Sequence, residues 1–299
     1  MSDYDKVLIE EKDYLKSVIS FLDEHISVAG ELANKQKKNL VALRKEMFAG
    51  GVSTVDDFDR NIEMSQFHAM ERMETAQYEQ KLSNVEKYKR VYDKPYFARF
   101  DFTEDEEDLE KIYLGYQNIM DDQSYKVFVY DWRAPIASMF YRNEIGAASY
   151  QAPCGEIRGA VSLKRQYEIE KGELKYYFDS SIAITDEMLQ QALGHNASSY
   201  MKNIVETIQK EQDLIIRDKG NDLLMVQGVA GSGKTSIAMH RIAFLLYERM
   251  SEGLTSDNIM IISPNHLFGE YVSTVLPELG ENNVCYSTME ELFELYFKG

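Results

Sequence analysis

One eight-residue stretch of the sequence has the residue types and the spacing of a phosphate-binding loop. It runs from Gly228 to Thr235 and fits the pattern of a glycine, four residues, and then Gly-Lys-Thr. Glycines let successive backbone N–H groups turn toward a phosphate, and the positive end of a following helix adds to the attraction. We expect Lys234 to reach the β- and γ-phosphates and Thr235 to offer its hydroxyl to Mg²⁺. The stretch therefore predicts binding of a nucleoside triphosphate with Mg²⁺.

The flanks of this loop have the order of strand, loop and helix that the motif requires. The apolar run over residues 222–227 predicts a short buried strand, and residues 236–247 have the period of an amphipathic helix. A glycine turn that binds nothing is the alternative, and the agreement of spacing and flanks argues against it. Lys234 and Thr235 are the catalytic candidates. The residues expected to hold the nucleotide here are Gly228, Val229, Ala230, Gly231, Ser232, Gly233, Lys234, Thr235 and Ser236.

Residues 191–299 as a whole predict an α/β lobe that carries the loop. Helical character covers residues 201–217, ahead of the loop, while residues 258–263 predict a second core strand and residues 266–276 a further helix. Alternating strands and helices are typical of a parallel sheet. The expected fold is a P-loop NTPase lobe of the RecA-like type with a parallel sheet.

The first 94 residues predict an antiparallel helical hairpin, a coiled-coil arm. Apolar residues recur at spacings of three and four from Leu15 to Met47, which is a seam that repeats every seven residues. Gly50 and Gly51 then break the helix, and a second helical pattern follows. A coiled coil that joins two copies of the chain, or one that is only a spacer, is the alternative.

Residues 95–190 predict a small, mostly antiparallel β region. An acidic run over residues 103–108 predicts a solvated turn, and Lys171-Gly172 lies where a hairpin should reverse. The expected strands cover residues 96–102, 126–132, 157–170 and 173–178.

Composition limits the class of protein. The 299 residues have room for two or three domains, and 44% of them are hydrophobic. The formal net charge is −17 and no third of the chain is net basic, so we expect a protein partner before DNA. No apolar run approaches the roughly 20 residues that span a bilayer, and no signal-sequence pattern opens the chain. A cytoplasmic protein without a membrane partner is expected.

Several blocks outside the loop are specific enough to indicate a family. They are Asp131–Ile136 with Phe140-Tyr141, Leu163–Tyr167, Tyr177–Ser180, Asp186–Gln190, Ile204–Gln212, His240-Arg241, Ile262–Asn265 and Val275–Gly280. With these blocks and the loop, the chain resembles the N-terminal part of the HelD-like branch of the UvrD/Rep superfamily 1 helicases, which are bacterial ATPases that act on RNA polymerase. The resemblance covers nearly the whole chain.

The resemblance implies roles for residues outside the loop. Gln212 has the position of the glutamine that hydrogen-bonds the adenine edge, so ATP is the implied nucleotide; an exposed helical glutamine is the alternative. Ser263, Pro264 and Asn265 match the motif that lines the single-strand path in DNA helicases, and a turn that ends a strand explains them equally well. Ser236 is a departure, because DNA-unwinding relatives often carry an arginine there that packs on the base.

The resemblance also implies a partner, the core of RNA polymerase. In HelD-like proteins a helical hairpin is thought to enter the secondary channel of the polymerase with acidic residues at its tip, near the catalytic Mg²⁺. Asp56 and Asp57 fit such a tip, and the alternative is the common use of acidic residues at a helix start. Asp131, Trp132 and Arg133 invite a catalytic interpretation, but an ion pair and a buried indole that hold the β region against the ATPase core explain them as well or better.

Parts of a working motor have no counterpart in the sequence. Phosphoryl transfer needs a second acidic pair for Mg²⁺ and an arginine finger, and no strand after Thr235 ends in Asp-Glu. Because family members are much longer, we expect a fragment that is inactive alone. The expected function is ATP–Mg²⁺ binding within an ATPase that remodels or recycles RNA polymerase complexes by displacing nucleic acid. A DNA helicase or translocase of the UvrD/Rep type with an accessory coiled coil is the alternative, and a binding module without a motor is a third reading.

Overall fold

The computed structural model describes residues 3–49, 57–105, 107–121, 123–179, 205, 208–264 and 267–297. The chain forms two compact units, one of residues 1–95 with 169–175 and one of residues 96–168 with 176–299. The boundary expected near residue 190 stays a prediction, since it lies outside the described residues.

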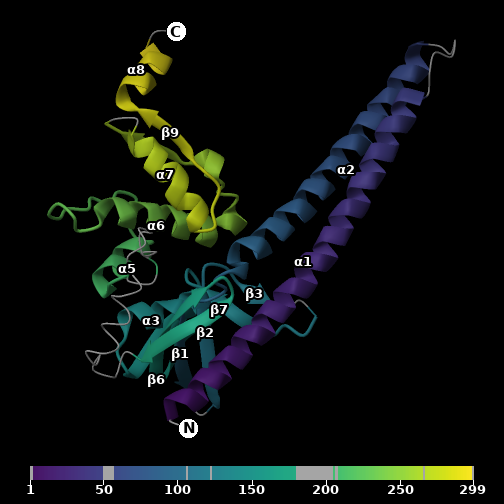
Figure 1. Ribbon diagram of the computed structural model, residues 1–299. Helices are drawn as coiled ribbons and strands as arrows, with labels where there is room; N and C mark the ends of the chain where they lie inside the picture. Colours follow the sequence, from purple (N-terminus) through teal and green to yellow (C-terminus); the bar gives the residue numbers. More distant parts are fainter. Residues whose placement is uncertain are drawn as a thin grey trace. The chain divides into compact units, whose positions relative to one another are not determined.

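Two long helices dominate the first unit. Helix α1 (Asp3–Ala49) and helix α2 (Asp57–Tyr92) run side by side in opposite directions (Figure 1), as the predicted hairpin requires. None of the described helices, these two included, combines the length and the apolar composition that a membrane span needs. The buried apolar residues of α1 follow the predicted seam and are Leu15, Val18, Leu22, Ala33 and Leu40.

Polar contacts fix how the two helices pair. Gln36 lies in the seam, is only 6% exposed, and its amide nitrogen donates to Glu74 and, at 3.1 Å, to the Oε1 of Gln77. A polar residue in a seam specifies the register of a coiled coil, because a shift would leave it buried without partners. Met73 of α2 is 56% exposed and so lies outside this buried seam.

The β region of the second unit is one seven-stranded sheet (Figure 1). Its order is β3-β4-β2-β1-β6-β5, with β7 paired to β6. The β1–β2, β1–β6, β3–β4 and β5–β6 pairs are antiparallel and the β2–β4 pair is parallel, so the mostly antiparallel sheet is confirmed. The strands are β1 (Ala98–Glu104), β2 (Leu109–Gly115), β3 (Ile119–Met120), β4 (Val127–Asp131), β5 (Gly146–Ala152), β6 (Gly155–Glu170) and β7 (Glu173–Asp179).

Strand β1 is buried along most of its length. Every residue from Ala98 to Phe102 is buried, as is typical of a strand covered on both faces. One face carries Phe100 and Phe102, and the other carries Arg99 and Asp101, whose side chains pair at 2.6 Å. The pairing makes burial of the two charges tolerable.

Helices and one small sheet make up the rest of the second unit. Strands β8 (Met260–Ser263) and β9 (Cys285–Thr288) pair in parallel. The helices are α3 (Ser138–Arg142), α5 (Lys210–Ile216), α6 (Lys234–Glu248), α7 (Leu267–Glu278) and α8 (Met289–Phe297), with single turns at Pro135–Ala137, Met250–Glu252 and Ser256–Asn258.

The strand expected before the phosphate loop is absent from the described structure. Residues 222–227 form no strand, and the side chains of Leu223 and Met225 are 86% and 88% exposed. A strand is stabilised by hydrogen bonds to its neighbours and by burial of its faces, whereas this segment pairs with no described strand and only Leu224 and Val226 are half-buried. In the part of the chain that the structure describes, parallel pairing near the loop is limited to β8 and β9, so the parallel lobe expected around the loop is not seen.

Candidate nucleotide site

The phosphate-loop residues turn sharply into helix α6. Gly231 and Gly233 both have φ of +81°, a left-handed conformation that glycine adopts without steric cost. The N–H of Ile237 donates to the carbonyl oxygen of Gly233 at 2.8 Å, which is an early hydrogen bond of the helix. The loop therefore ends at a helix N-terminus, where backbone N–H groups have no partner within the helix and favour an anion.

Lys234 closes the loop on itself. Its ammonium donates to the carbonyl oxygens of Gly228 at 2.9 Å and Val229 at 2.7 Å. Both acceptors are neutral, so the described structure pairs this charge with no carboxylate. Thr235 follows it in the first turn of α6 and is exposed. The ammonium of Lys234 therefore lies at the loop, and its N–H groups can turn from these carbonyl oxygens to a phosphate.

A pocket of about 410 Å³ joins the loop to helices α5 and α6. This volume is within the usual range for small-molecule sites. The wall has a phosphate-loop part, an apolar part and a polar part. Its residues are Ile208, Gln209, Gln212, Ile216, Gly231, Ser232, Gly233, Ser236, Ile237 and His240.

Gln212 lies against the loop. A Cβ added to Gly233 would be 3.4 Å from the amide nitrogen of Gln212, and the backbone N–H of Gln209 donates to its amide oxygen at 3.1 Å. Gln209 is extended (φ −80°, ψ 159°), so helix α5 begins at Lys210. The continuous helix expected over residues 201–217 was wrong in this respect, because the reciprocal cap formed by the two glutamines starts the helix here.

His240 forms a buried part of the same wall. The residue is 1% exposed, and its Nδ1 lies 2.7 Å from the carbonyl oxygen of Ser236. A carbonyl oxygen only accepts, so Nδ1 carries the proton and Nε2 keeps its lone pair. That Nε2 has no hydrogen-bond partner in the described structure, and burial lowers the pKa of His240 from 6.5 although the bond to Ser236 opposes the shift.

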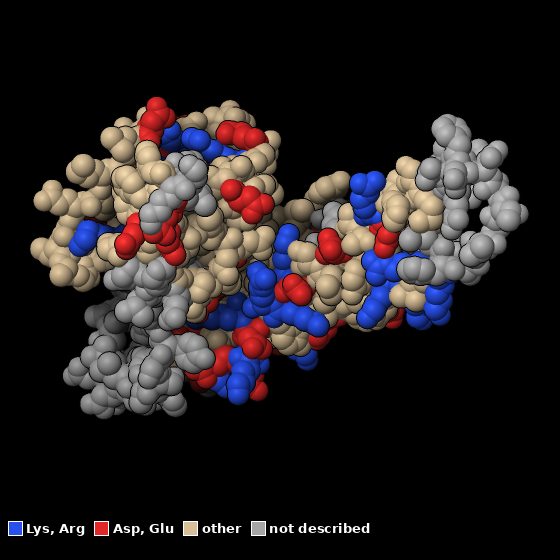
Figure 2. Space-filling model, turned by 90° about the horizontal axis from the view of Figure 1, so that it is seen from above, with Lys and Arg blue, Asp and Glu red and all other residues tan. Residues whose placement is uncertain are grey.

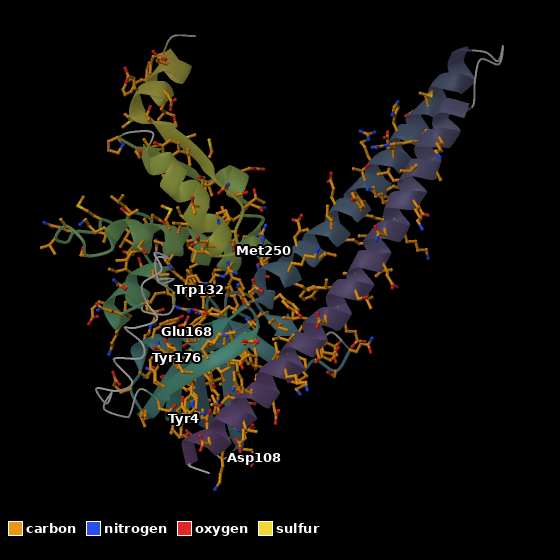
Figure 3. All side chains as sticks on the ribbon, viewed as in Figure 1. Tyr4, Asp108, Trp132, Glu168, Tyr176 and Met250 are labelled. Atoms are coloured by element: carbon orange, nitrogen blue, oxygen red, sulfur yellow. The ribbon has the colours of Figure 1, made fainter. Side chains whose placement is uncertain are left out.

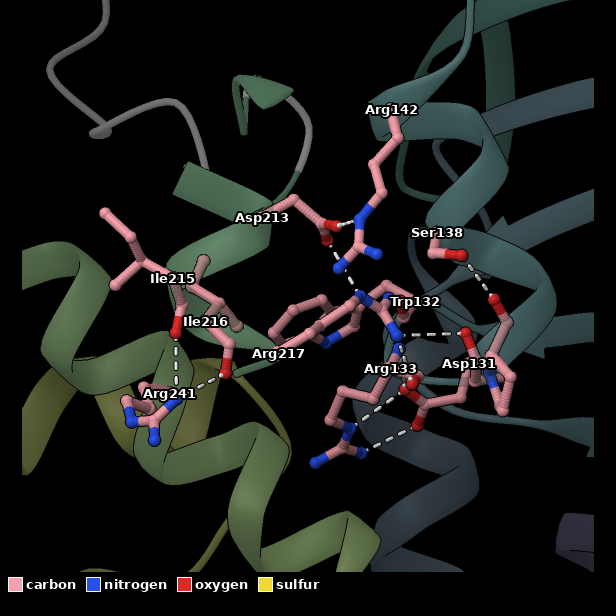
Figure 4. Close-up of polar contacts among 12 residues, drawn as sticks. Asp131, Trp132, Arg133, Ser138, Arg142, Asp213, Ile215, Ile216, Arg217 and Arg241 are labelled. Carbon is pink, nitrogen blue, oxygen red and sulfur yellow. Dashed lines mark hydrogen bonds and ion pairs between the residues drawn. The ribbon is translucent and has the colours of Figure 1, made fainter. Parts of the chain in front are cut away.

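Helix α5 is tied on another side to the turn after β4 (Figure 4). Asp213 is 0% exposed and accepts from Arg142 and, at 2.7 Å, from the Nε of Arg217. The guanidinium of Arg217 is itself buried and meets three carbonyl oxygens in a row. They belong to Trp132, Arg133 at 2.7 Å and Ala134 at 3.2 Å. One helix therefore carries both a pocket residue and the anchor of the β region.

The turn after β4 is held from within as well. Asp131 accepts from the Nε and Nη2 of Arg133 at 2.8 and 2.7 Å, and Arg133 also donates to Glu281. Trp132, which is labelled in Figure 3, is fully buried, and its ring centroid lies 5.6 Å from that of His240. The ion pair and buried indole predicted for this block are confirmed, and they join the β region to α6.

One residue of the predicted nucleic-acid motif, Ser263, makes a structural contact between two strands. Ser263 ends strand β8, is 6% exposed, and its hydroxyl lies 2.7 Å from the hydroxyl of Tyr286 in β9. Pro264 follows and is exposed, and Asn265 lies outside the described residues. The contact of Ser263 links the two parallel strands, and a nucleic-acid role for the three residues stays a prediction.

The tip of the helical arm also lies largely outside the described structure. Asp56 is not described, and Asp57 is described only as the first residue of α2, so the acidic tip stays a prediction. The neighbouring part of α1 is locally basic, in spite of the net charge of the chain, and Figure 2 shows Lys and Arg side chains gathered on the arm. Between Leu32 and Lys45 the basic residues are Lys35, Lys37, Lys38, Arg44 and Lys45, with no Asp or Glu among them.

Sequence reasoning missed part of the pocket wall. His240 comes four residues after Ser236, one helical turn along α6, and this spacing places both on one face of the helix. This spacing alone could have predicted that the two residues lie together. No sequence pattern places Ile208 and Gln209 in the wall, because the start of α5 depends on a cap that the apolar pattern does not reveal.

The fold and the pocket define a mixed α/β protein with a glycine-rich loop of the phosphate-binding type. The family model described as "DNA helicase IV HelD, N-terminal domain" matches residues 8–195, which is more than half of the chain. The chain belongs to this family, as the resemblance predicted. A search of curated proteins found no match. The family match ends before the phosphate loop, so the case for nucleotide binding rests on the loop and pocket themselves.

Proposed function

We propose that this chain binds ATP with Mg²⁺ at the phosphate loop, as part of a HelD-type, helicase-like ATPase. The observation that carries the proposal is the single pocket to which the loop, α5 and α6 all contribute. Its loop end is formed by Gly231, Ser232 and Gly233, which directly precede Lys234 in the chain, and its other end offers apolar and amide side chains. A triphosphate joined to a flat base has the matching distribution of charge and apolar surface.

Residues of the phosphate loop and of the pocket suit the parts of the nucleotide. Phosphate oxygens would take the ammonium of Lys234 from the neutral carbonyls of Gly228 and Val229, because charged acceptors make stronger hydrogen bonds. Thr235 is exposed, and its hydroxyl would hold Mg²⁺, which neutralises phosphate charge when bound. The base would lie among the isoleucines of the wall, with Gln212 at its edge.

Replacing Lys234 with alanine should weaken MgATP binding by about 10- to 100-fold, since a charged hydrogen bond contributes about 1.5–3 kcal/mol. Isothermal titration calorimetry on the whole chain would measure it. Lys219→Ala is the matched control, because Lys219 is an exposed lysine paired with Glu248 and lies outside the phosphate loop. If wild type binds no MgATP, or if both variants bind as wild type does, the proposal fails.

The larger activity that we propose is removal of nucleic acid from RNA polymerase, with the polymerase core as the partner of the helical arm. The two-helix arm, which has the form that the resemblance to HelD-like proteins implies for a polymerase-binding element, supports this partner. A DNA helicase or translocase is the second candidate, and the family description, which names a DNA helicase, favours it.

The two candidates differ in what the chain binds at roughly physiological salt. On the polymerase hypothesis, the chain captures core RNA polymerase, and Asp56→Ala/Asp57→Ala weakens this binding by at least about tenfold if the acids lie near a metal centre. Lys6→Ala in the opposite end of α1 is the control for the arm. Biolayer interferometry with immobilised polymerase and with single-stranded DNA measures both. Binding to DNA without binding to polymerase would support the helicase hypothesis instead.

A further inference from the structure

Helix α5 carries two rows of side chains with different tasks. Gln212 and Ile216 lie four residues apart and line the pocket, while Asp213 and Arg217, also four residues apart, form a buried ion pair. Four residues are close to one helical turn, so each pair shares a face, and the two faces are turned from each other by about 100°. A movement of the ion-pair face therefore moves the pocket face with it.

The helix is too short to hold its own position. It has 7 residues, whereas isolated helices of fewer than about 12–15 residues are marginal in water. The reciprocal cap of Gln209 and Gln212 starts it, and Arg241 of α6 fixes its C-terminal end by donating to the carbonyl oxygens of Ile215 and Asp218, both at 2.8 Å. The position of the middle of the helix, next to Gln212, depends on another contact.

The β region supplies that contact (Figure 4). Asp213 is 0% exposed, and its carboxylate accepts from Arg142 of helix α3 and from Arg217. Arg217 is held in turn by the carbonyl oxygens of residues 132–134. A carboxylate buried this deeply is costly to leave unpaired, so Asp213, and α5 with it, must follow the two arginines.

We infer that the segment of residues 132–142 is a positioning element of the nucleotide pocket. Through Arg142 and Arg217 it fixes α5, and so sets where the wall formed by Gln212 and Ile216 lies relative to the phosphate loop. The phosphate end of the site follows the loop and α6, which are one continuous stretch of chain. The β region thus controls how tightly the base end of the nucleotide binds. The inference rests on the proposed nucleotide binding and adds residues that regulate the affinity of that site.

The test compares MgATP with magnesium tripolyphosphate, which has three phosphates but no base or ribose, by calorimetry on the whole chain. Arg217→Lys keeps the charge but loses the planar fork that bonds Asp213 and the carbonyl oxygens together, so it should weaken MgATP binding by about tenfold. Its affinity for tripolyphosphate should stay unchanged. Loss of folded protein alone would lower both affinities alike, so the ratio of the two affinities reports the position of α5.

Arg165→Lys is the matched control. Arg165 in β6 forms the same type of buried ion pair, with Asp179 at 2.6 Å, and the exposed fractions of the Arg165 and Arg217 side chains are 7% and 6%. The same exchange in β6 should lower stability but leave the ratio of affinities at the wild-type value. Arg142→Ala removes the other partner of Asp213 from a side chain that is 33% exposed, and it should also weaken MgATP binding selectively. It replaces Arg217→Lys if circular dichroism shows that variant to be unfolded.

The outcomes separate this inference from the proposed function. If wild type binds neither ligand, the proposed function fails. If wild type binds MgATP and the α5 variants change the ratio no more than Arg165→Lys does, the positioning role is refuted while nucleotide binding stands. A loss of MgATP affinity that is confined to the α5 variants and spares tripolyphosphate supports the inference.

Discussion

Arg217→Ala should lower the free energy of unfolding of the second unit by about 3–5 kcal/mol, the usual cost of leaving a buried charge without its partner. Arg217 pairs with Asp213, which is 0% exposed, and it also satisfies the three carbonyl oxygens of residues 132–134. Removing the guanidinium therefore leaves both a carboxylate and buried carbonyls short of donors. Arg142 still contacts Asp213, which limits the loss but does nothing for the carbonyls.

Urea unfolding followed by circular dichroism measures the effect. Arg249→Ala is the matched control, because the side chain of Arg249 is 50% exposed and its contact with Glu252 is 3.9 Å long; it should cost less than about 1 kcal/mol. Arg217→Lys keeps the charge but not the planar fork of donors, so it should restore only part of the stability. A cost for Arg217→Ala no larger than that of the control would show that α5 is not anchored through this side chain.

The importance of Arg217 could not be predicted from its own surroundings in the sequence. Asp213 and Arg217 are four residues apart, which is also the spacing of an ordinary exposed helical pair. Their burial comes from the turn at residues 131–134, about eighty positions earlier in the chain. The block Asp131-Trp132-Arg133 did give a signal, because its opposite charges can form an ion pair and its large apolar ring favours burial.

Local geometry explains which elements were predicted well. The seam of α1 was predictable because a long helix that packs on one partner needs an apolar residue in every turn. The loop and α6 were predictable because glycine spacing and a helix start are local properties. Strand β5 was missed because Gly146, Ala147, Ala148 and Ser149 have low strand propensity, and its position depends on pairing with β6.

The segment before the loop shows the opposite limit. The apolar residues of 222–227 predict a buried strand, but such a strand exists only where neighbouring strands supply hydrogen bonds and cover. In the described structure, β8 and β9 pair with each other, and Leu223 and Met225 are left exposed. The apolar composition of the segment favoured a strand. The segment forms none in the described structure, because no neighbouring strand pairs with it.

Substitution of Trp132 should have the second large effect on stability, and two variants separate the contribution of its volume from that of its N–H group. Trp132→Ala should lower the free energy of unfolding by about 3–5 kcal/mol, as expected when removal of a fully buried large ring leaves a cavity. Trp132→Phe should lower it by about 1 kcal/mol or less. The indole Nε1 is buried without a hydrogen-bond partner in the described structure, so phenylalanine loses some packing but also removes an unsatisfied donor.

The comparison uses the same urea unfolding measurement for both variants, with Phe128→Leu in β4 as a control for an aromatic change that is not fully buried. Because Trp132 packs on His240, the loss in Trp132→Ala should also reach the pocket and weaken MgATP binding, while Trp132→Phe should leave this binding close to that of wild type. If phenylalanine costs as much as alanine, the indole N–H makes a bond that ring packing cannot replace. The turn after β4 would then be held by that bond, and its role next to the nucleotide pocket would be polar instead of steric.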